Sequence, residues 1–199
     1  IMAFVGTSPR RMVLGFMLAT GFLSMWISNT ATATLMLPIG MAVAEVFRPK
    51  ELDPTLRPFN FGIALMLGIA YGASIGGVAT LIGTPPNAVL AAAAEELLDT
   101  RIGFLEWMAV GVPVVAVLLP LAWMLLVYAL FPPGEVSGDA GEVIREERSE
   151  LGRMGRGEKM VAMIFVLAAL SWIMRDPKTL GAFTVPGIAT FAPEVRDST

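Results

Sequence analysis

Four long stretches of the chain carry no charged residue and alternate with charged segments. They cover residues 12–44, 58–94, 107–131 and 160–174. A helix needs about 20 apolar residues to cross the hydrocarbon core of a bilayer. Three of the stretches exceed that length and the fourth is slightly short. The pattern therefore predicts an all-α integral membrane protein with several embedded helices.

A polar triplet, Ser28-Asn29-Thr30, interrupts the first stretch near its middle. The apolar flank on either side is shorter than one membrane span. Non-helical backbone inside a membrane is tolerated only where it is buried in protein or lines a cavity. We therefore predict a re-entrant helical hairpin over about 12–46, with the triplet at its tip as a binding-site candidate. Two full spans over the same residues are the alternative.

A second break lies in the next apolar segment, which runs over about 59–98 and is twice the length of one span. The break is the Gly-Thr-Pro-Pro-Asn segment at 83–87. Proline disrupts a helix interior but suits the first turn of a new helix. We therefore predict a broken transmembrane helix, in which one half ends near Gly83 and the other begins near Pro86.

Both breaks should place helix ends inside the membrane. The second leg of the hairpin should begin near Asn29 or Thr30, both favourable N-cap types. Each of the two helix N-termini would offer unpaired backbone N–H groups and a partial positive charge, which suit an anion. The ends of the preceding half-helices would offer carbonyls, Ser hydroxyls and the Asn amide oxygen, which suit sodium. Discontinuous helices of this kind are typical of secondary transporters.

The composition narrows the chemistry further. The chain is 55% hydrophobic and 16% charged and contains neither Cys nor His, which excludes disulfides, Cys- or His-ligated metals and His-based catalysis. The three long stretches also lack a carboxylate for proton coupling, and no Ser in the membrane runs has a base for intramembrane catalysis. We therefore expect a protein that is not an enzyme, with no organic cofactor and no nucleic-acid partner.

Loop charges orient the helices, because Lys and Arg favour the cytoplasmic side. Basic residues flank both ends of the hairpin and five more lie in the loop 132–159, whereas the loop after the second stretch is acidic. We predict a hairpin that enters from and returns to the cytoplasm, a helix over about 104–131 that returns inward, and a helix over 160–174 that crosses outward. Arg175 and Lys178 in the predicted external tail count mildly against this topology.

Other polar and small residues in the stretches are assigned structural roles. In membrane helices Ser and Thr often bond back to the preceding turn or pack against a neighbouring helix, and we expect this of Thr20, Thr32, Thr34 and Ser74. Close helix packing is expected of Gly62, Gly68, Gly72, Gly76 and Gly77. Interfacial or packing roles are expected of Trp26, Trp107, Trp123 and Trp172.

The segments at the two breaks resemble a known family. Residues 24–32 read Ser-Met-Trp-Ile-Ser-Asn-Thr-Ala-Thr and are followed by Met-Leu-Pro-Ile at 36–39. They resemble the signature of the divalent anion:sodium symporters of the INDY type, the carriers of dicarboxylates, citrate and sulfate. Residues 76–87, Gly-Gly-Val-Ala-Thr-Leu-Ile-Gly-Thr-Pro-Pro-Asn, resemble the second loop of that family. The similarity covers nearly the whole chain and weakens after about residue 130.

The resemblance implies half of an inverted-repeat, elevator-type transporter with a mobile transport domain and a homodimeric scaffold. Residues 1–131 would belong to the transport domain, 132–159 would form a cytoplasmic connector, and 160–199 would supply a scaffold helix and an external tail. The family places a second Ser-Asn-Thr hairpin and a second sodium site in its C-terminal half. This sequence holds no second copy. We therefore expect an incomplete chain that does not transport by itself.

The resemblance also implies which residues bind. By position in the motifs, the sodium ligands would be Ser24, Ser28, Asn29 and the backbone of Gly83. The carboxylate of a small anionic substrate would meet Ser28, Asn29, Thr30 and Thr84. The residues that shape the second loop would be Pro85, Pro86 and Asn87. Thr84 stands where bacterial members commonly have Ser. This replacement keeps the hydroxyl and adds a methyl group.

The function implied is sodium-coupled uptake of di- or tricarboxylates such as succinate. The protein would be multi-pass, embedded in a lipid bilayer, and located in the bacterial inner membrane. A sodium-independent exchanger or a sulfate carrier of the same family is the alternative. An arsenite or proton-antiport permease is more distant, because the long stretches lack the carboxylate that proton coupling would use.

Overall fold

The computed structural model describes residues 8–48, 59–134, 155–174, 178–180, 183–185 and 187. As predicted, most of these residues are helical; the others form the turns and loops between the helices and one small ribbon. The helices are α2 (Pro9–Ser24), α3 (Asn29–Val46), α4 (Asn60–Gly76), the 3-10 helix η1 (Gly77–Ala79), α5 (Pro85–Leu98), α6 (Phe104–Met124), the π-helix η2 (Leu125–Leu130) and α8 (Arg156–Ile173). Most of the predicted connector and external tail lies outside the described residues.

The ribbon was not predicted from the apolar pattern. Its two strands, β1 (Lys178–Leu180) and β2 (Phe183–Val185), pair antiparallel with Thr179 opposite Thr184. The residues between Lys178 and Val185 include Thr, Phe and Val, which favour strands. The segment is too short for a periodicity argument to have found it.

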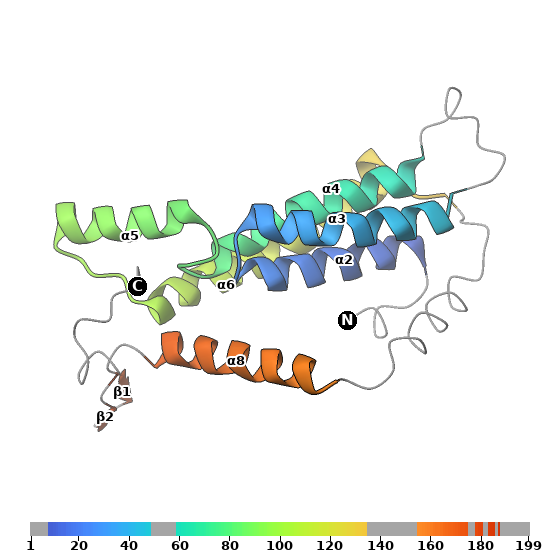
Figure 1. The fold of residues 1–199 in the computed structure, drawn as a ribbon. Helices are drawn as coiled ribbons and strands as arrows, with labels where there is room; N and C mark the ends of the chain where they lie inside the picture. Colours follow the sequence, from blue (N-terminus) through green and yellow to red (C-terminus); the bar gives the residue numbers. More distant parts are fainter. Residues whose placement is uncertain are drawn as a thin grey trace.

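Helix α4 lies at the centre of a bundle with α2, α3 and α6 (Figure 1). Its buried side chains meet those of α2, and the largest fully buried ones are Phe16, Phe61, Met17, Leu65, Ile69 and Val13. Lipid tails are as apolar as these side chains, so close van der Waals packing stabilises the association of such helices in a membrane. The hairpin formed by α2 and α3 is thereby fixed against α4.

Glycines allow α2 and α4 to approach closely. A Cβ atom added at Gly72 would lie 3.0 Å from the carbonyl oxygen of Met17, and one added at Gly76 would lie 2.3 Å from that of Gly21. A Cβ at Gly68 would lie 3.1 Å from the Met17 side chain. The packing role predicted for Gly68, Gly72 and Gly76 is confirmed.

Gly62 differs from the other glycines of α4. A Cβ atom added there would meet the ring of Phe59 at 2.6 Å. Phe59 is the N-cap of α4 itself. The prediction that Gly62 packs against another helix is therefore wrong, because this glycine makes room for the entry of its own helix.

The first predicted break occurs where expected. Helix α2 ends at Ser24 and α3 begins at Asn29. The capping residue is Ser28, whose hydroxyl accepts a hydrogen bond from the N–H of Ala31 at 3.3 Å. The N-cap is therefore one residue before the predicted pair, since the Ser28 side chain reaches the third residue of the helix.

The second break lies earlier than predicted on one side. Helix α4 ends at Gly76 and η1 extends it only to Ala79, not to Gly83. The segment after Ala79 leaves the helical path because Thr80 is extended and its hydroxyl bonds to the hairpin. Helix α5 begins at Pro85, one residue before the predicted start.

Two helical segments of the described part are long and apolar enough to cross a membrane. They are Asn60–Ala79, with a mean hydropathy of 1.7, and Phe104–Leu130, with a mean hydropathy of 2.5. The second segment contains Pro113 and Pro120 and finishes as a π-helix. It lies along α4 in the bundle (Figure 1).

The π-helix anchors the start of the hairpin. Trp123 in the last turn of α6 and Tyr128 in η2 meet edge to face, with their ring centres 5.7 Å apart. The indole of Trp123 donates a hydrogen bond to the carbonyl oxygen of Arg10 at 2.8 Å. The Arg10 guanidinium lies 4.8 Å from the centre of the Tyr128 ring. The packing role of Trp123 is thus confirmed, and it fixes α2 to the end of α6.

Helix α8 begins at Arg156, four residues before the predicted scaffold helix. The extension is stabilised by Glu158, whose carboxylate accepts a hydrogen bond from the N–H of Gly155 at 2.7 Å. Two aromatic pairs link α8 to the rest of the chain: Trp26 with Phe165 at 5.4 Å, and Phe104 with Trp172 at 6.4 Å. Apart from these contacts most of its side chains are exposed.

Candidate ion and anion site

The turn of the hairpin lies against the loop that follows η1. The hydroxyl of Thr80 in this loop donates a hydrogen bond to the carbonyl oxygen of Met25 in the turn. A Cβ atom added at Gly83 would lie 2.9 Å from the carbonyl oxygen of Ser24 and 2.4 Å from that of Gly77. The two breaks, 55 residues apart in the sequence, therefore form one site.

The amide of Asn29 lies between the hairpin and η1. The hydroxyl of Ser24 donates a hydrogen bond to Asn29 Oδ1 at 2.7 Å. A Cβ atom added at Gly77 would lie only 2.1 Å from the same Oδ1. The packing role expected of Gly77 is met in a particular way, because this glycine makes room for the side chain of Asn29, the first residue of α3.

Oxygen atoms lie at this amide and beside the adjacent loop. The Ser24 hydroxyl lies beside Asn29 Oδ1, and the backbone carbonyl oxygens of Ser24 and Gly77 lie close to Gly83 in the adjacent loop. Ser24, Gly77 and Gly83 are buried. In the described part of the chain no group of three or more His, Cys, Asp or Glu is placed to hold a metal. A cation at this point would rest on neutral oxygen atoms, as cations do between the broken helices of transporters.

The start of α3 is open to an anion. The N–H of Ala31 bonds to the Ser28 hydroxyl and that of Thr32 to the Ser28 carbonyl. Within the described structure, the N–H groups of Asn29 and Thr30 carry no hydrogen bond. Thr30 is exposed. This helix end therefore offers free donors together with the positive end of the helix dipole.

The start of α5 offers much less than predicted. Its first two residues are Pro85 and Pro86, which have no N–H, and the N–H of Asn87 bonds to the carbonyl oxygen of Thr84 at 3.1 Å. The expectation that this helix N-terminus also offers unpaired backbone N–H groups is therefore wrong for its first three residues. On this side the donor left for an anion is the half-buried Thr84, whose hydroxyl makes no capping bond.

Asn87 holds the second loop in shape. Its side-chain amide donates to the carbonyl oxygens of Gly77 at 2.9 Å and Thr80 at 2.7 Å. The Thr80 hydroxyl accepts a hydrogen bond from the N–H of Gly83 at 3.1 Å. The loop-shaping role of Asn87 remains a prediction that this geometry favours. Thr80 was not singled out from the sequence, although it is the one hydroxyl residue between η1 and Gly83.

Trp107 supports the break from α6. Its indole donates a hydrogen bond to the carbonyl oxygen of Val78 at 2.9 Å. A Cβ atom added at Gly111 would lie 2.7 Å from the same oxygen, so α6 and η1 are in close contact. The sequence indicated an interfacial or packing role for Trp107 but not the carbonyl that it satisfies.

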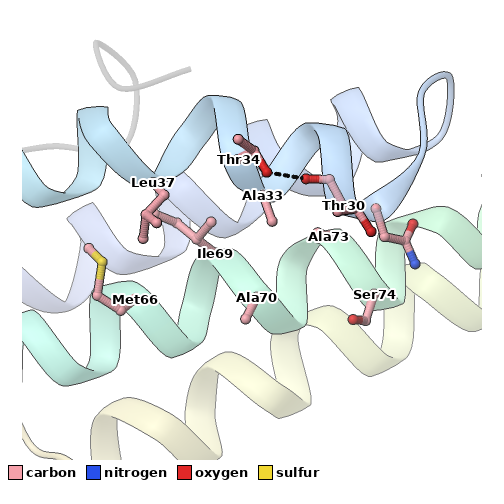
Figure 2. A pocket seen from close by; sticks show the side chains of 10 residues that line it. Thr30, Ala33, Thr34, Leu37, Met66, Ile69, Ala70, Ala73 and Ser74 are labelled. Carbon is pink, nitrogen blue, oxygen red and sulfur yellow. Dashed lines mark hydrogen bonds between the residues drawn. The ribbon is translucent and has the colours of Figure 1, made fainter.

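A cleft of about 420 Å³ opens between α3 and α4 beside Asn29 and Thr30 (Figure 2). The hydroxyl residues along it are Thr34 and Ser74, and the other lining residues are Ala33, Leu37, Met66, Ile69, Ala70 and Ala73. Thr34 donates to the carbonyl oxygen of Thr30 at 2.8 Å, as predicted for a hydroxyl that bonds back. Among the described residues the hydroxyls of Thr20 and Thr32 have no hydrogen-bond partner, so these two residues pack without bonding back.

Comparison with known proteins identifies related chains. The family model described as citrate transporter (CitMHS) matches residues 1–195. The sodium-dependent dicarboxylate transporter SdcS of Staphylococcus saprophyticus is 43% identical over 175 residues, which is 86% of this chain and 34% of that protein. The protein of the same name from Staphylococcus aureus USA300 is 41% identical over 179 residues, which is 88% of this chain and 34% of that protein.

The chain spans about a third of the length of the curated relatives that it matches. The matches include both breaks, and they confirm the resemblance indicated by the two motifs. Together with the two candidate spans they place the chain in a membrane, as predicted. These relatives are named as transporters.

Proposed function

Since the chain belongs to the citrate transporter family, we propose that it is part of a secondary active transporter that moves di- or tricarboxylates into the cell together with sodium. The transport activity is proposed for the full-length protein, because the match covers only 34% of each of the curated relatives, which are named as sodium-dependent dicarboxylate transporters. The observation that carries the proposal is the meeting of two broken helical elements at neutral oxygen atoms: the Ser24 hydroxyl contacts Asn29 Oδ1, and Gly83 lies against the Ser24 carbonyl oxygen.

The proposed sodium ligands are Ser24, Ser28, Asn29 and the backbone of Gly83. In support, Ser24 Oγ and Asn29 Oδ1 lie 2.7 Å apart, and the Cα of Gly83 lies against the Ser24 carbonyl. To bind sodium, the Ser24 hydroxyl would rotate and keep its proton, so that its oxygen and Asn29 Oδ1 both face the ion. The contact with sodium would then take the place of the hydrogen bond between them.

The proposed carboxylate ligands are Ser28, Asn29, Thr30 and Thr84. The free N–H groups at the start of α3 and the exposed Thr30 hydroxyl favour this assignment. The Asn29 amide would face both ligands, with its oxygen on sodium and its NH₂ on the carboxylate. Sodium would therefore fix the orientation in which Asn29 donates to the anion, and this couples the two binding events.

The proposed architecture is a re-entrant hairpin and a broken helix in a mobile transport domain of residues 1–131. Helices α2 and α3 have 16 and 18 residues, so at 1.5 Å per residue they are roughly 24 and 27 Å long, short of the roughly 30 Å hydrocarbon core. The segment 132–159 would be the cytoplasmic connector. Residues 160–199 would belong to a dimeric scaffold, which suits the sparse aromatic contacts of α8.

Uptake of labelled succinate into proteoliposomes that contain the full-length protein tests the function. We expect uptake with an inward sodium gradient and none when potassium replaces sodium. Uptake that does not depend on sodium but increases when the proteoliposomes contain succinate would instead establish an exchanger. Uptake of sulfate and not of carboxylates would establish the sulfate carrier.

Replacing Ser24 with Ala should raise the sodium concentration for half-maximal uptake about tenfold. The change removes the Ser24 oxygen from the proposed sodium ligands. A polar contact to a charged group contributes about 1.5 kcal/mol or more, which corresponds to about tenfold in affinity. The measurement is succinate uptake as a function of sodium concentration. Ser171→Ala is the control, because that hydroxyl bonds only to the carbonyl oxygen of Ala168 in α8. An unchanged sodium dependence would remove Ser24 from the site.

A further inference from the structure

Thr80 is fully buried, and its hydroxyl both donates and accepts a hydrogen bond. It donates to the carbonyl oxygen of Met25 and accepts from the N–H of Gly83. The bundle offers a direct contrast, because the buried hydroxyls of Thr20 and Thr32 have no hydrogen-bond partner. A buried polar group that forms two bonds is costly to remove, whereas one without a partner is not.

The two partners of Thr80 belong to different broken elements. Met25 is the C-cap of α2 in the hairpin turn, and Gly83 lies in the loop before α5. Among the described residues, no other hydrogen bond joins the turn 25–28 to the loop 80–84. Among these residues the side chain of Thr80 therefore supplies the hydrogen bond that joins the two tips.

The backbone of Thr80 is fixed as well. Its carbonyl oxygen accepts a hydrogen bond from the buried amide of Asn87, which also holds the carbonyl oxygen of Gly77. A movement of Thr80 with the hairpin turn would therefore break its hydrogen bonds to the second loop, and a movement with the loop would break its hydrogen bond to the turn. A displaced loop would move Gly83 away from Ser24, whose carbonyl it now faces.

We propose that Thr80 is a positioning residue for sodium: it sets the separation between the Gly83 backbone and the Ser24–Asn29 pair, and it touches neither the ion nor the substrate. This inference rests on the proposed function of the site. It predicts that loss of the hydroxyl weakens sodium binding. The affinity for the dicarboxylate at saturating sodium should change little.

The test compares Thr80→Val with Thr20→Val in the full-length protein. Valine has nearly the shape of threonine, so neither change opens a cavity, and only the first removes formed hydrogen bonds. We expect Thr80→Val to raise the sodium concentration for half-maximal succinate uptake at least tenfold, with the KM for succinate at saturating sodium changed less than twofold. Thr20→Val should behave as the wild type. Thr80→Ser keeps the hydroxyl, so its sodium concentration for half-maximal uptake should lie within threefold of that of the wild type.

A second readout does not depend on transport. The melting temperature of the purified protein is measured against sodium chloride, with choline chloride at equal ionic strength as the reference, because an ion that binds the folded state raises it. In Thr80→Val, the sodium concentration that gives half of the rise in melting temperature should increase by the same factor as the sodium concentration for half-maximal uptake. If Thr80→Val does not fold, Thr80→Ala takes its place, since it leaves room for a water between Met25 and Gly83, and it should show a smaller shift in the same direction.

The outcomes separate the two proposals. If the wild type depends on sodium but Thr80→Val needs the same sodium concentration for half-maximal uptake, the proposed function stands and the positioning role is overturned. Equal shifts in Thr80→Val and Thr20→Val would overturn it too, because the effect would then follow from any change in a buried threonine. A wild type that shows no sodium effect in either readout would overturn the proposed function and this inference with it.

Discussion

Replacing Gly77 with Ala should abolish sodium-dependent uptake while the protein stays folded. The new Cβ atom would lie 2.1 Å from Asn29 Oδ1, 2.9 Å from its Cγ and 3.1 Å from its Nδ2. All three close atoms belong to one side chain, which can rotate away without moving a helix. The substitution therefore displaces the amide that faces both proposed ligands.

The expected loss of uptake is large. A hydrogen bond to a charged group contributes about 1.5–3 kcal/mol, and the displaced amide serves both the cation and the carboxylate. Uptake at limiting sodium and succinate should fall on the order of 100-fold. The melting temperature without sodium should stay close to that of the wild type.

Initial uptake rates and thermal unfolding in detergent measure the two parts of this prediction. Gly157→Ala is the control, because no atom lies within 4 Å of a Cβ added there. If Gly77→Ala takes up succinate at the wild-type rate, uptake does not depend on the present position of the Asn29 amide. A large loss of stability would show that Gly77 acts in the fold.

Replacing the adjacent Gly76 with Ala should have the opposite result and destabilise the fold. The added Cβ atom would lie 2.3 Å from the carbonyl oxygen of Gly21, 2.4 Å from its Cα and 2.7 Å from its carbonyl carbon. These are backbone atoms of α2, so relief requires α2 and α4 to separate along their seam. Overpacking of this kind costs about 1–3 kcal/mol or more.

We expect the melting temperature of Gly76→Ala to fall by about 5 °C or more, with a lower yield of folded protein. Thermal unfolding in detergent, without sodium or substrate, measures it. Gly134→Ala is the matched control, since nothing lies within 4 Å of its added Cβ. Unchanged stability would mean that α2 and α4 are not held at the separation seen here.

The sequence alone determined the parts of this protein that depend on neighbouring residues. Uncharged stretches marked the membrane helices, and the polar triplet marked the end of one helix and the start of another. Pro85 fixed the start of α5, since proline suits the first turn of a helix. The small number of backbone donors at the start of that helix also follows from the sequence, because Pro85 and Pro86 have no N–H.

The tertiary structure alone decided which residues meet across the site. Gly76 and Gly77 are adjacent and identical, yet one contacts the backbone of α2 and the other the side chain of Asn29. Thr20 and Thr80 are both buried threonines, yet only Thr80 has partners. These differences depend on how α2 packs along α4. Periodicity and capping describe contacts within a few residues, whereas the contact between residues 25 and 80 exists only after the helices have packed.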